Sequence, residues 1–256
     1  MSIKGIDVSV HQGVIDFNSL KSDSNVGFAM IRAGYRGWGD GSLNVDANFD
    51  VNYTGFTSIG VPVGAYFFSQ AKSYAEGKEE ADFLINHLLG KKFQYPICID
   101  SELSGASGNV GRADNISVNE RTQALIGFCK TIENAGYYAM IYCSASWLDS
   151  KLNSAELSGY DKWIAKWSLI KPAASYGTGI WQNSNNGSIK GIKGRVDTDI
   201  SYRDYPSIMN SSFLNGYVKP IDKYDVSITD ITNGDKVKFE QLAQALNIKA
   251  ISVNKK

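Results

Sequence analysis

The sequence contains few residues of the kinds that bind metal ions or form covalent cross-links. It has only 2 histidines and 3 cysteines in 256 residues. No Cys/His spacing resembles a zinc site, and two histidines cannot supply a histidine-rich metal centre. The cysteines are odd in number, and each lies in an apolar strand-like or helical run, which predicts buried free thiols rather than a disulfide framework. Their positions are Cys98, Cys129 and Cys143.

Long hydrophobic runs are also missing. No apolar stretch approaches the roughly 20 residues that span a bilayer, so stable membrane insertion is not expected. The sequence begins MSIKGIDVSVHQG, which already alternates like a β-strand and has no basic-then-apolar leader, and this predicts a protein made in the cytoplasm without a signal peptide. Lys+Arg and Asp+Glu each number 26, and this balance argues against a nucleic-acid partner held by counterion release.

The remaining composition is typical of a globular protein, with 43% hydrophobic and 20% charged residues. Eight short apolar runs predict β-strands, and several are nearly continuous in apolarity, as expected for strands buried on both faces. The eight predicted strands are Lys4–Ser9, Gly27–Ala33, Val61–Phe68, Tyr95–Glu102, Tyr137–Cys143, Lys162–Trp167, Thr178–Gln182 and Arg195–Ile200.

Helical patterns separate some of these strands. Apolar residues recur at helical spacing in Ser73–Leu89, and Ser117–Asn134 opens with a capping box and is followed by Gly136. Strands that alternate with helices predict an α/β fold with parallel core strands, and eight of them predict a (β/α)8-type barrel. The connections 167–179 and 182–195 are too short and polar for full helices, so the barrel is expected to be modified and partly degenerate.

The pattern changes near residues 215–220. We expect a β/α barrel domain over residues 1–215, a linker over 216–223 and a small C-terminal α/β segment over 224–256. That last segment reads as strand, turn, helix and strand, and it is too small to fold without help from another surface.

Carboxylates fall where three of the predicted strands end, and functional side chains collect there in a parallel barrel. Asp7 ends the first strand, Asp100 and Glu102 the fourth, and Asp197 or Asp199 the eighth. Residues i and i+2 of a strand face the same side, so Asp100 and Glu102 are expected to lie close enough to differ in proton affinity. Enzymes that cleave glycosidic bonds typically use a protonated carboxyl group together with an ionised one. A solvated acidic loop is the alternative interpretation.

Other side chains at the same strand ends are candidates for substrate binding. An arginine there can hold a carboxylate bidentately, although a structural salt bridge is the commoner role. Aromatic rings there can stack on sugar rings, although core packing is the default for any single one. These candidates are Arg32, Tyr66, Phe68, Tyr142, Trp181 and Gln182.

Taken together, these motifs resemble those of the glycoside hydrolase family 25 muramidases, the Chalaropsis-type lysozymes found among phage endolysins and bacterial autolysins. The resemblance covers about residues 3–210. One departure is visible, because the third strand reads Tyr66-Phe67-Phe68 where the family often has Tyr-His-Phe. The matching segments are Gly5–Gly13 with Ile15–Phe17, Ala29–Ala33, Gly64–Phe68, Ile99–Glu102, Met140–Ser144, Trp163–Ala165, Trp181–Gln182 and Gly194–Asp197.

The resemblance implies a modified β/α barrel that cleaves the β-1,4 bond between N-acetylmuramic acid and N-acetylglucosamine, without a metal or other cofactor. Glu102 matches the family's general acid and Asp100 its partner carboxylate. Asp7 and Asp197 match aspartates that line the site. Asp199 is the less favoured alternative to Asp197, because the family's pattern is usually Val-Asp followed by a non-acidic residue.

The resemblance also implies bacterial cell-wall peptidoglycan as the partner. A phage-encoded protein of this kind would reach the wall through a holin or by lysis, and a bacterial one would act outside the cell. Residues 224–256 are then expected to bind the wall or to mediate self-association through contact with a second subunit.

Other functions stay open from the residues alone. A chitinase-like glycosidase also carries Asp-x-Glu, but usually with further acidic and glycine positions that Tyr95–Ile99 lacks. A non-catalytic wall-binding lectin on a degenerate barrel would not need the full set of carboxylates. A metal-dependent amidase needs ligand sets that this sequence lacks.

Overall fold

The computed structural model describes residues 2–22, 25–105 and 110–219, together with positions 234, 235, 237, 238 and 241. The chain divides into two units, Met1–Val218 and Lys219–Lys256. The predicted C-terminal segment, residues 224–256, lies outside the described residues except at those five positions, so its role stays a prediction.

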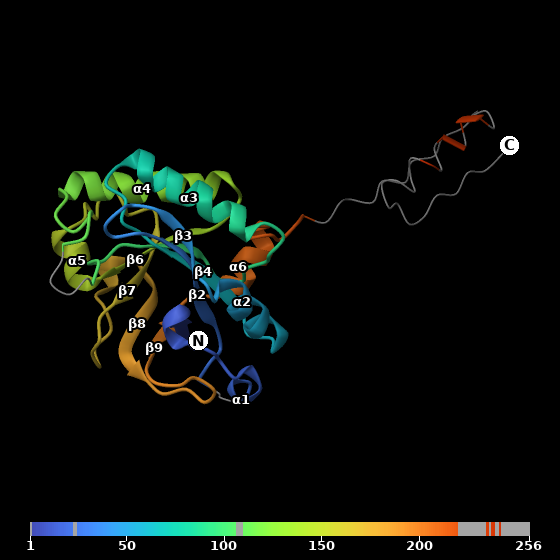
Figure 1. The fold of residues 1–256 in the computed structure, drawn as a ribbon, viewed down its shortest axis with the longest axis horizontal. Helices are drawn as coiled ribbons and strands as arrows, with labels where there is room; N and C mark the ends of the chain where they lie inside the picture. Colours follow the sequence, from blue (N-terminus) through green and yellow to red (C-terminus); the bar gives the residue numbers. More distant parts are fainter. Residues whose placement is uncertain are drawn as a thin grey trace. The chain divides into compact units, whose positions relative to one another are not determined.

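The described strands form one sheet that closes into a barrel (Figure 1). Closure occurs because β1 pairs with both β9 and β2, while the short β3 extends the sheet beyond β2 outside the barrel. The predicted eight-stranded α/β barrel is confirmed, and each predicted strand corresponds to one of its strands. The strands are β1 Ile3–Val8, β2 Ala29–Arg36, β3 Leu43–Val45, β4 Val63–Phe68, β5 Ile97–Asp100, β6 Ala139–Ser144, β7 Asp161–Ala165, β8 Thr178–Gly187 and β9 Val196–Ser201.

One barrel strand runs against the others. The pairings β1–β2, β2–β4, β4–β5, β5–β6, β6–β7 and β7–β8 are parallel, whereas β9 is antiparallel to both β1 and β8. A parallel return needs a crossover of about a dozen residues or more, and only residues 188–195 separate β8 from β9. We predicted a modified barrel with parallel core strands, and β9 is the antiparallel strand of that barrel. Its reversal brings Asp197, near its start, to the rim where the parallel strands end.

Helices cover the outside of the barrel (Figure 1). The predicted capping box of α4 is present between Ser117 and Glu120, and Gly136 follows that helix with φ of 82°. Only a 3-10 turn follows β7, and no helix joins β8 to β9, as the short connections predicted. Helices α1, α2, α5 and α6 and strand β3 were not predicted. The helices are α1 Phe17–Leu20, α2 Phe49–Ser58, α3 Tyr74–Leu88, α4 Val118–Asn134, α5 Ala145–Ser150 and α6 Tyr205–Ser212, with 3-10 turns η1 Val10–Gln12 and η2 Ala174–Tyr176.

The alternation of side chains along each strand divides the core into two layers. Outward-facing residues pack beneath the helices. Inward-facing residues such as Met30, Met140 and Trp163 fill the barrel, and α6 closes its amino-terminal end through Tyr205 and Met209. The cysteines are free and buried, as predicted. No helix in the described part of the chain is long and apolar enough to span a bilayer.

A stability prediction follows from the contact between α3 and α4, which depends on glycine. A Cβ at Gly77 would overlap the carbonyl oxygen of Ala124, and one at Gly127 would overlap that of Tyr74. Gly77→Ala is expected to lower the free energy of unfolding by about 1–3 kcal/mol, because this overlap outweighs the helix preference of alanine. Denaturant unfolding followed by circular dichroism measures it. Gly159→Ala is the control, because nothing lies within 4 Å of a Cβ there. Equal losses in the two variants would contradict the packing explanation.

Candidate active site

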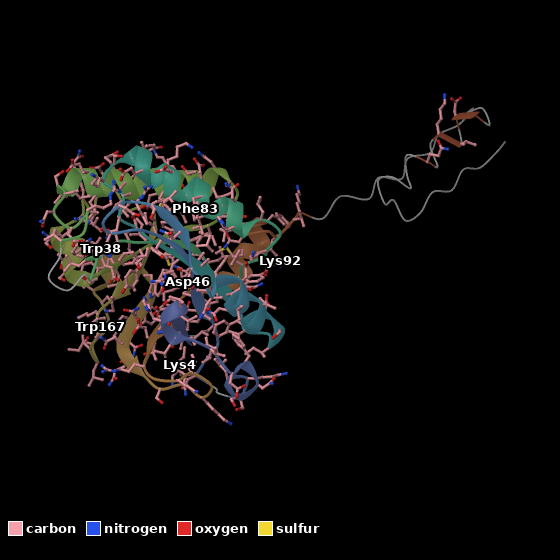
Figure 2. The ribbon with its side chains drawn as sticks, in the orientation of Figure 1. Lys4, Trp38, Asp46, Phe83, Lys92 and Trp167 are labelled. Atoms are coloured by element: carbon pink, nitrogen blue, oxygen red, sulfur yellow. The ribbon has the colours of Figure 1, made fainter. Side chains whose placement is uncertain are left out.

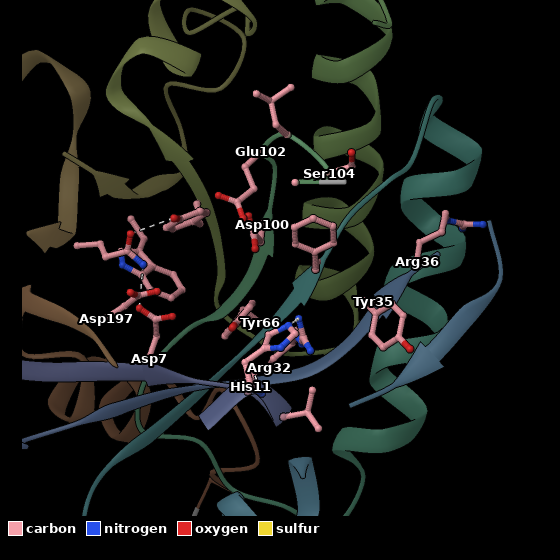
Figure 3. Close-up of a pocket in the computed structure, with 18 of the residues that line it drawn as sticks. Asp7, His11, Arg32, Tyr35, Arg36, Tyr66, Asp100, Glu102, Ser104 and Asp197 are labelled. Carbon is pink, nitrogen blue, oxygen red and sulfur yellow. Dashed lines mark hydrogen bonds between the residues drawn. The ribbon is translucent and has the colours of Figure 1, made fainter. Parts of the chain in front are cut away.

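A cavity of about 580 Å³ opens at the rim where the parallel strands end (Figure 3). Every predicted site residue except Trp181 lines it. Its lining residues are Asp7, Ser9, Val10, His11, Gln12, Arg32, Tyr35, Arg36, Trp38, Tyr66, Phe68, Asp100, Glu102, Leu103, Ser104, Gly105, Tyr142, Trp163, Gln182 and Asp197.

The carboxylates of the cavity come from two sides of the barrel. Asp100 ends β5, and Glu102 lies two residues beyond it. Asp7 on β1 is paired with Asp197 on β9 in the antiparallel register. In the closed order of eight strands, β5 is four strands from β9 in either direction, so the Asp100–Glu102 pair faces the Asp7–Asp197 pair across the mouth. Figure 3 shows these two groups separately, with Glu102 beside Asp100 and Asp197 beside Asp7.

Asp100 and Glu102 both bind protons more tightly than ordinary carboxyl groups. Asp100 is 4% exposed, and burial and the neighbouring Glu102 raise its pKa well above the usual range, while Arg32 opposes the shift. Burial and the charge on Asp197 raise the pKa of Glu102 to about 7, against a hydrogen bond from Tyr142 that lowers it. The pair is therefore arranged to hold a proton near neutral pH, as a general acid requires.

Asp7 is held by an amide that other side chains orient. Gln182 Nε2 donates to Asp7 Oδ2 at 2.9 Å. The oxygen of the same amide accepts from the Tyr142 hydroxyl at 3.1 Å and from Trp167 Nε1 at 3.0 Å. An indole N–H can only donate, so Trp167 fixes which end of the amide is the oxygen, and the nitrogen must face Asp7.

Asp199 does not line the cavity but contacts a residue that does, Trp163. The side chain is 1% exposed, and its Oδ1 accepts from Trp163 Nε1 at 2.7 Å. Asp7 is close enough for the two carboxyl groups to repel each other when both are ionised. Burial raises the pKa of Asp199 to about 8, and burial and Asp199 together raise the pKa of Asp7 well above its usual range. Of the two β9 aspartates, Asp197 is the one that lines the cavity.

Arg32 lines the cavity but is paired with a residue outside the predicted set. Its Nε contacts Asp46 Oδ2 at 2.7 Å, and the Val10 amide donates to the same oxygen at 3.0 Å. Its NH1 lies 3.5 Å from His11 Nε2. The commoner role of a strand arginine, a structural salt bridge, is therefore present here, and none of the predicted site carboxylates is its ion-pair partner.

Trp181 is not part of the cavity, contrary to our prediction. Neighbouring residues of a strand point to opposite faces, so with Gln182 directed inward Trp181 must point outward. Its Nε1 donates to the Lys166 carbonyl oxygen at 2.8 Å, and the ring is 6% exposed. Its aromatic character alone gave no information about which face it occupies.

Several lining residues were missed by the sequence analysis. We ended the second strand at Ala33, but β2 shifts register there and continues to Arg36, which carries Tyr35 and then Trp38 to the rim. A bulge of this kind redirects side chains near a site and leaves no alternating pattern to detect. In the described part of the chain, no group of three or more His, Cys, Asp or Glu side chains is arranged to hold a metal ion.

Comparisons with known proteins agree with this geometry. The model for glycosyl hydrolases family 25 matches residues 6–192. The chain is 28% identical over 198 residues to the autolytic lysozyme of Clostridium acetobutylicum, an alignment that covers 77% of this chain and 55% of that protein. It is 28% identical over 213 residues to lysozyme M1 of Streptomyces globisporus, covering 76% and 66%. The crystal structure of a bacterial lysozyme from Streptomyces coelicolor matches with a TM-score of 0.66 and 26% identity, covering 78% and 92%.

The coupling between the two carboxylate groups gives a pKa prediction. Asp197→Asn is expected to lower the pKa of Glu102 from about 7 toward 4.5, because the charge on Asp197 is the second cause of the shift after burial. A ¹³C NMR titration of the glutamate carboxyl carbons measures this change. Asp82→Asn, on the exposed face of α3, is the matched control. A Glu102 pKa that does not move in Asp197→Asn would show that burial alone sets it.

The buried Asp199 predicts a dependence of stability on pH. Its pKa is about 8 in the folded protein and 3.8 ordinarily, so between these values the folded chain holds more protons than the unfolded chain. Its contribution to stability therefore falls as pH rises through this range. Asn resembles the protonated acid, so Asp199→Asn should raise Tm at pH 8 and change it little at pH 4. The expected rise is at least about 2–4 °C, which corresponds to about 1 kcal/mol in the free energy of unfolding for a chain of this size. Thermal melts at the two pH values measure this, and an equal shift at both would contradict it.

Proposed function

Because the chain belongs to family 25 of the glycosyl hydrolases, we propose that it is a muramidase. It cleaves the β-1,4 bond between N-acetylmuramic acid and N-acetylglucosamine in peptidoglycan. The matched relatives named as lysozymes support this activity, although the chain spans only 55% and 66% of their lengths.

The observation that carries the proposal is the placing of the carboxyl groups around one cavity. Asp100 and Glu102 follow β5, and Asp7 and Asp197 lie across the mouth on β1 and β9. A glycosidic bond held between these groups would have a proton donor on one side and carboxylates able to stabilise positive charge around it.

Glu102 is the general acid of this mechanism. With a pKa of about 7 it keeps its proton at neutral pH, and it gives that proton to the oxygen of the leaving sugar as the bond breaks. Glu102 carries the proton of the pair, so Asp100 is ionised and supports the positive charge that develops at the sugar ring or orients the acetamido group. Water then adds to the anomeric carbon of that sugar and returns a proton to Glu102. Asp7 and Asp197 line the opposite wall, where Gln182 fixes Asp7. Tyr66, Phe68 and Tyr142 contribute binding surface.

We place this action at the bacterial cell wall, with peptidoglycan as the partner. A phage-encoded enzyme would be released to the wall by a holin or by lysis, and a bacterial one would work outside the cell. Wall attachment or self-association through residues 224–256 belongs to the same proposal and is tested by deleting them. Loss of wall binding or a change in molecular mass by light scattering would separate the two roles.

The activity is tested on purified Gram-positive cell walls with the wild type and Glu102→Gln. The wild type is expected to clear the walls and release new muramic-acid reducing ends. Glu102→Gln should lose about 10²–10⁴-fold in rate, the usual contribution of a general acid, while still binding walls. The alkaline limb of the wild-type rate profile should fall as pH rises through about 7, because the acid then loses its proton.

Glu156→Gln is the control, because this exposed glutamate only accepts surface hydrogen bonds from Gln123 and Asn153. Clearing without reducing ends would identify an amidase or a peptidase and reject the muramidase. Wall binding without clearing would indicate a lectin, and release of ends from chitin but not from walls would indicate a chitinase-like enzyme. Full activity in Glu102→Gln would reject the site assignment alone.

A further inference from the structure

Two tryptophan side chains stand exposed at the cavity mouth. Trp38 lines the cavity and is 45% exposed, and Trp167 contacts the cavity residue Gln182 and is 59% exposed. An indole ring left in water forgoes the free energy that burial of its apolar face would give. Two such rings beside one cavity indicate a ligand that covers them.

The Trp167 ring and the Trp38 backbone are held in place before any ligand arrives. Trp167 is tethered through Nε1 to Gln182 Oε1 at 3.0 Å. The carbonyl oxygen of Trp38 accepts from the Arg112 amide at 2.8 Å, and the Arg112 guanidinium forms two hydrogen bonds, of 2.8 and 2.9 Å, with the carboxylate of Glu76 on α3. A surface ordered in this way costs little entropy when a ligand binds it.

The strand order puts the two tryptophans on opposite sides of the mouth. Trp38 follows β2 and Trp167 follows β7, and these strands are four apart in either direction around the closed barrel. The two carboxylate pairs lie on a second diameter of the barrel, which crosses the diameter from β2 to β7. One pair follows β5, and the other pair lies on β1 and β9. In Figure 2 both residues are labelled at the left edge of the barrel, with Trp38 above Trp167.

We propose that Trp38 and Trp167 are stacking platforms for two sugar residues of one glycan strand, which lies across the mouth from β2 to β7 with the cleaved bond between the carboxylate pairs. This inference rests on the proposed muramidase function and specifies its substrate. A pyranose ring has an apolar C–H face that packs on an indole, while its hydroxyl and acetamido groups stay in water. The enzyme therefore takes extended strands and cuts within them, and Gln182 links the Trp167 platform to Asp7.

The experiment compares cleavage of peptide-free glycan strands with cleavage of the shortest oligosaccharide that the enzyme cuts. Trp38→Ala and Trp167→Ala should each raise KM for the long strands about tenfold, which is 1.4 kcal/mol of binding. The kcat of Trp38→Ala should stay within about twofold, whereas a fall in kcat shared by Trp167→Ala and Trp167→Phe would report the lost donor to Gln182. The shortest substrate does not reach both rings, so its KM should change less. Trp167→Phe keeps an aromatic ring but loses the donor to Gln182, and it should retain most of the affinity for long strands.

A binding measurement supplies a readout that does not need turnover. In the Glu102→Gln background, calorimetric titration with the same strands should give a Kd about tenfold weaker for each alanine variant. Phe213→Ala is the control, since this aromatic side chain is 40% exposed and follows α6 at the other end of the barrel. Thermal melts establish that every variant is folded.

The outcomes separate the two proposals. If the wild type neither cuts nor binds the strands, the muramidase function is rejected, and the platforms with it. If the wild type cuts them and the alanine variants match it at every length, only the platforms are rejected. A fall in kcat with KM unchanged would also reject them, because Trp167 would then act on Gln182 and Asp7 rather than on a sugar.

Discussion

Crowding of like charges at one end of the barrel is the constraint on which the site depends. Asp7, Asp100 and Asp199 are almost fully buried there, with Glu102 and Asp197 beside them. A low-dielectric interior does not hold that many ionised carboxylates, so burial and mutual repulsion keep some of the groups protonated. The same repulsion that destabilises the folded chain therefore keeps protonated carboxyl groups in the cavity near neutral pH, and the closely packed core beneath the helices must offset its cost.

The walls of this cavity are held mainly by polar contacts. Arg36 on β2 contacts Glu79 and Glu80 of α3 at 2.7 and 2.8 Å, and Arg112 joins the segment after β5 to the start of the same helix. Arg36 is 5% exposed and Glu80 is fully buried. Removing one member of such a pair would leave an uncompensated buried charge, which is why these contacts keep the rim in a single arrangement. The loops at the rim hold residues that line the cavity, and their ion pairs with α3 fix the position of these loops.

Much of the fold follows from local patterns in the sequence, and the exceptions have physical reasons. Apolar runs located all eight barrel strands, and the capping box located the start of α4, because both signals are local. The direction of β9 was not predictable from its own residues, since a period of two reads the same in either direction. Asp7, Asp100 and Glu102 could be placed because they lie at the ends of apolar runs, whereas Asp197 reaches the rim because β9 is reversed. Trp181 was misplaced because its facing depends on a one-residue register, and Tyr35 was missed because a bulge precedes it.

The buried thiols have a consequence for the conditions that the fold tolerates. Burial raises the pKa of Cys98, Cys129 and Cys143, so each stays a neutral thiol without the nucleophilic character that oxidants and disulfide exchange require. No disulfide holds the described part of the chain together, so none can be lost to a reductant. The barrel can thus pass between reducing and oxidising surroundings with its covalent structure unchanged, and its persistence in either depends on noncovalent contacts.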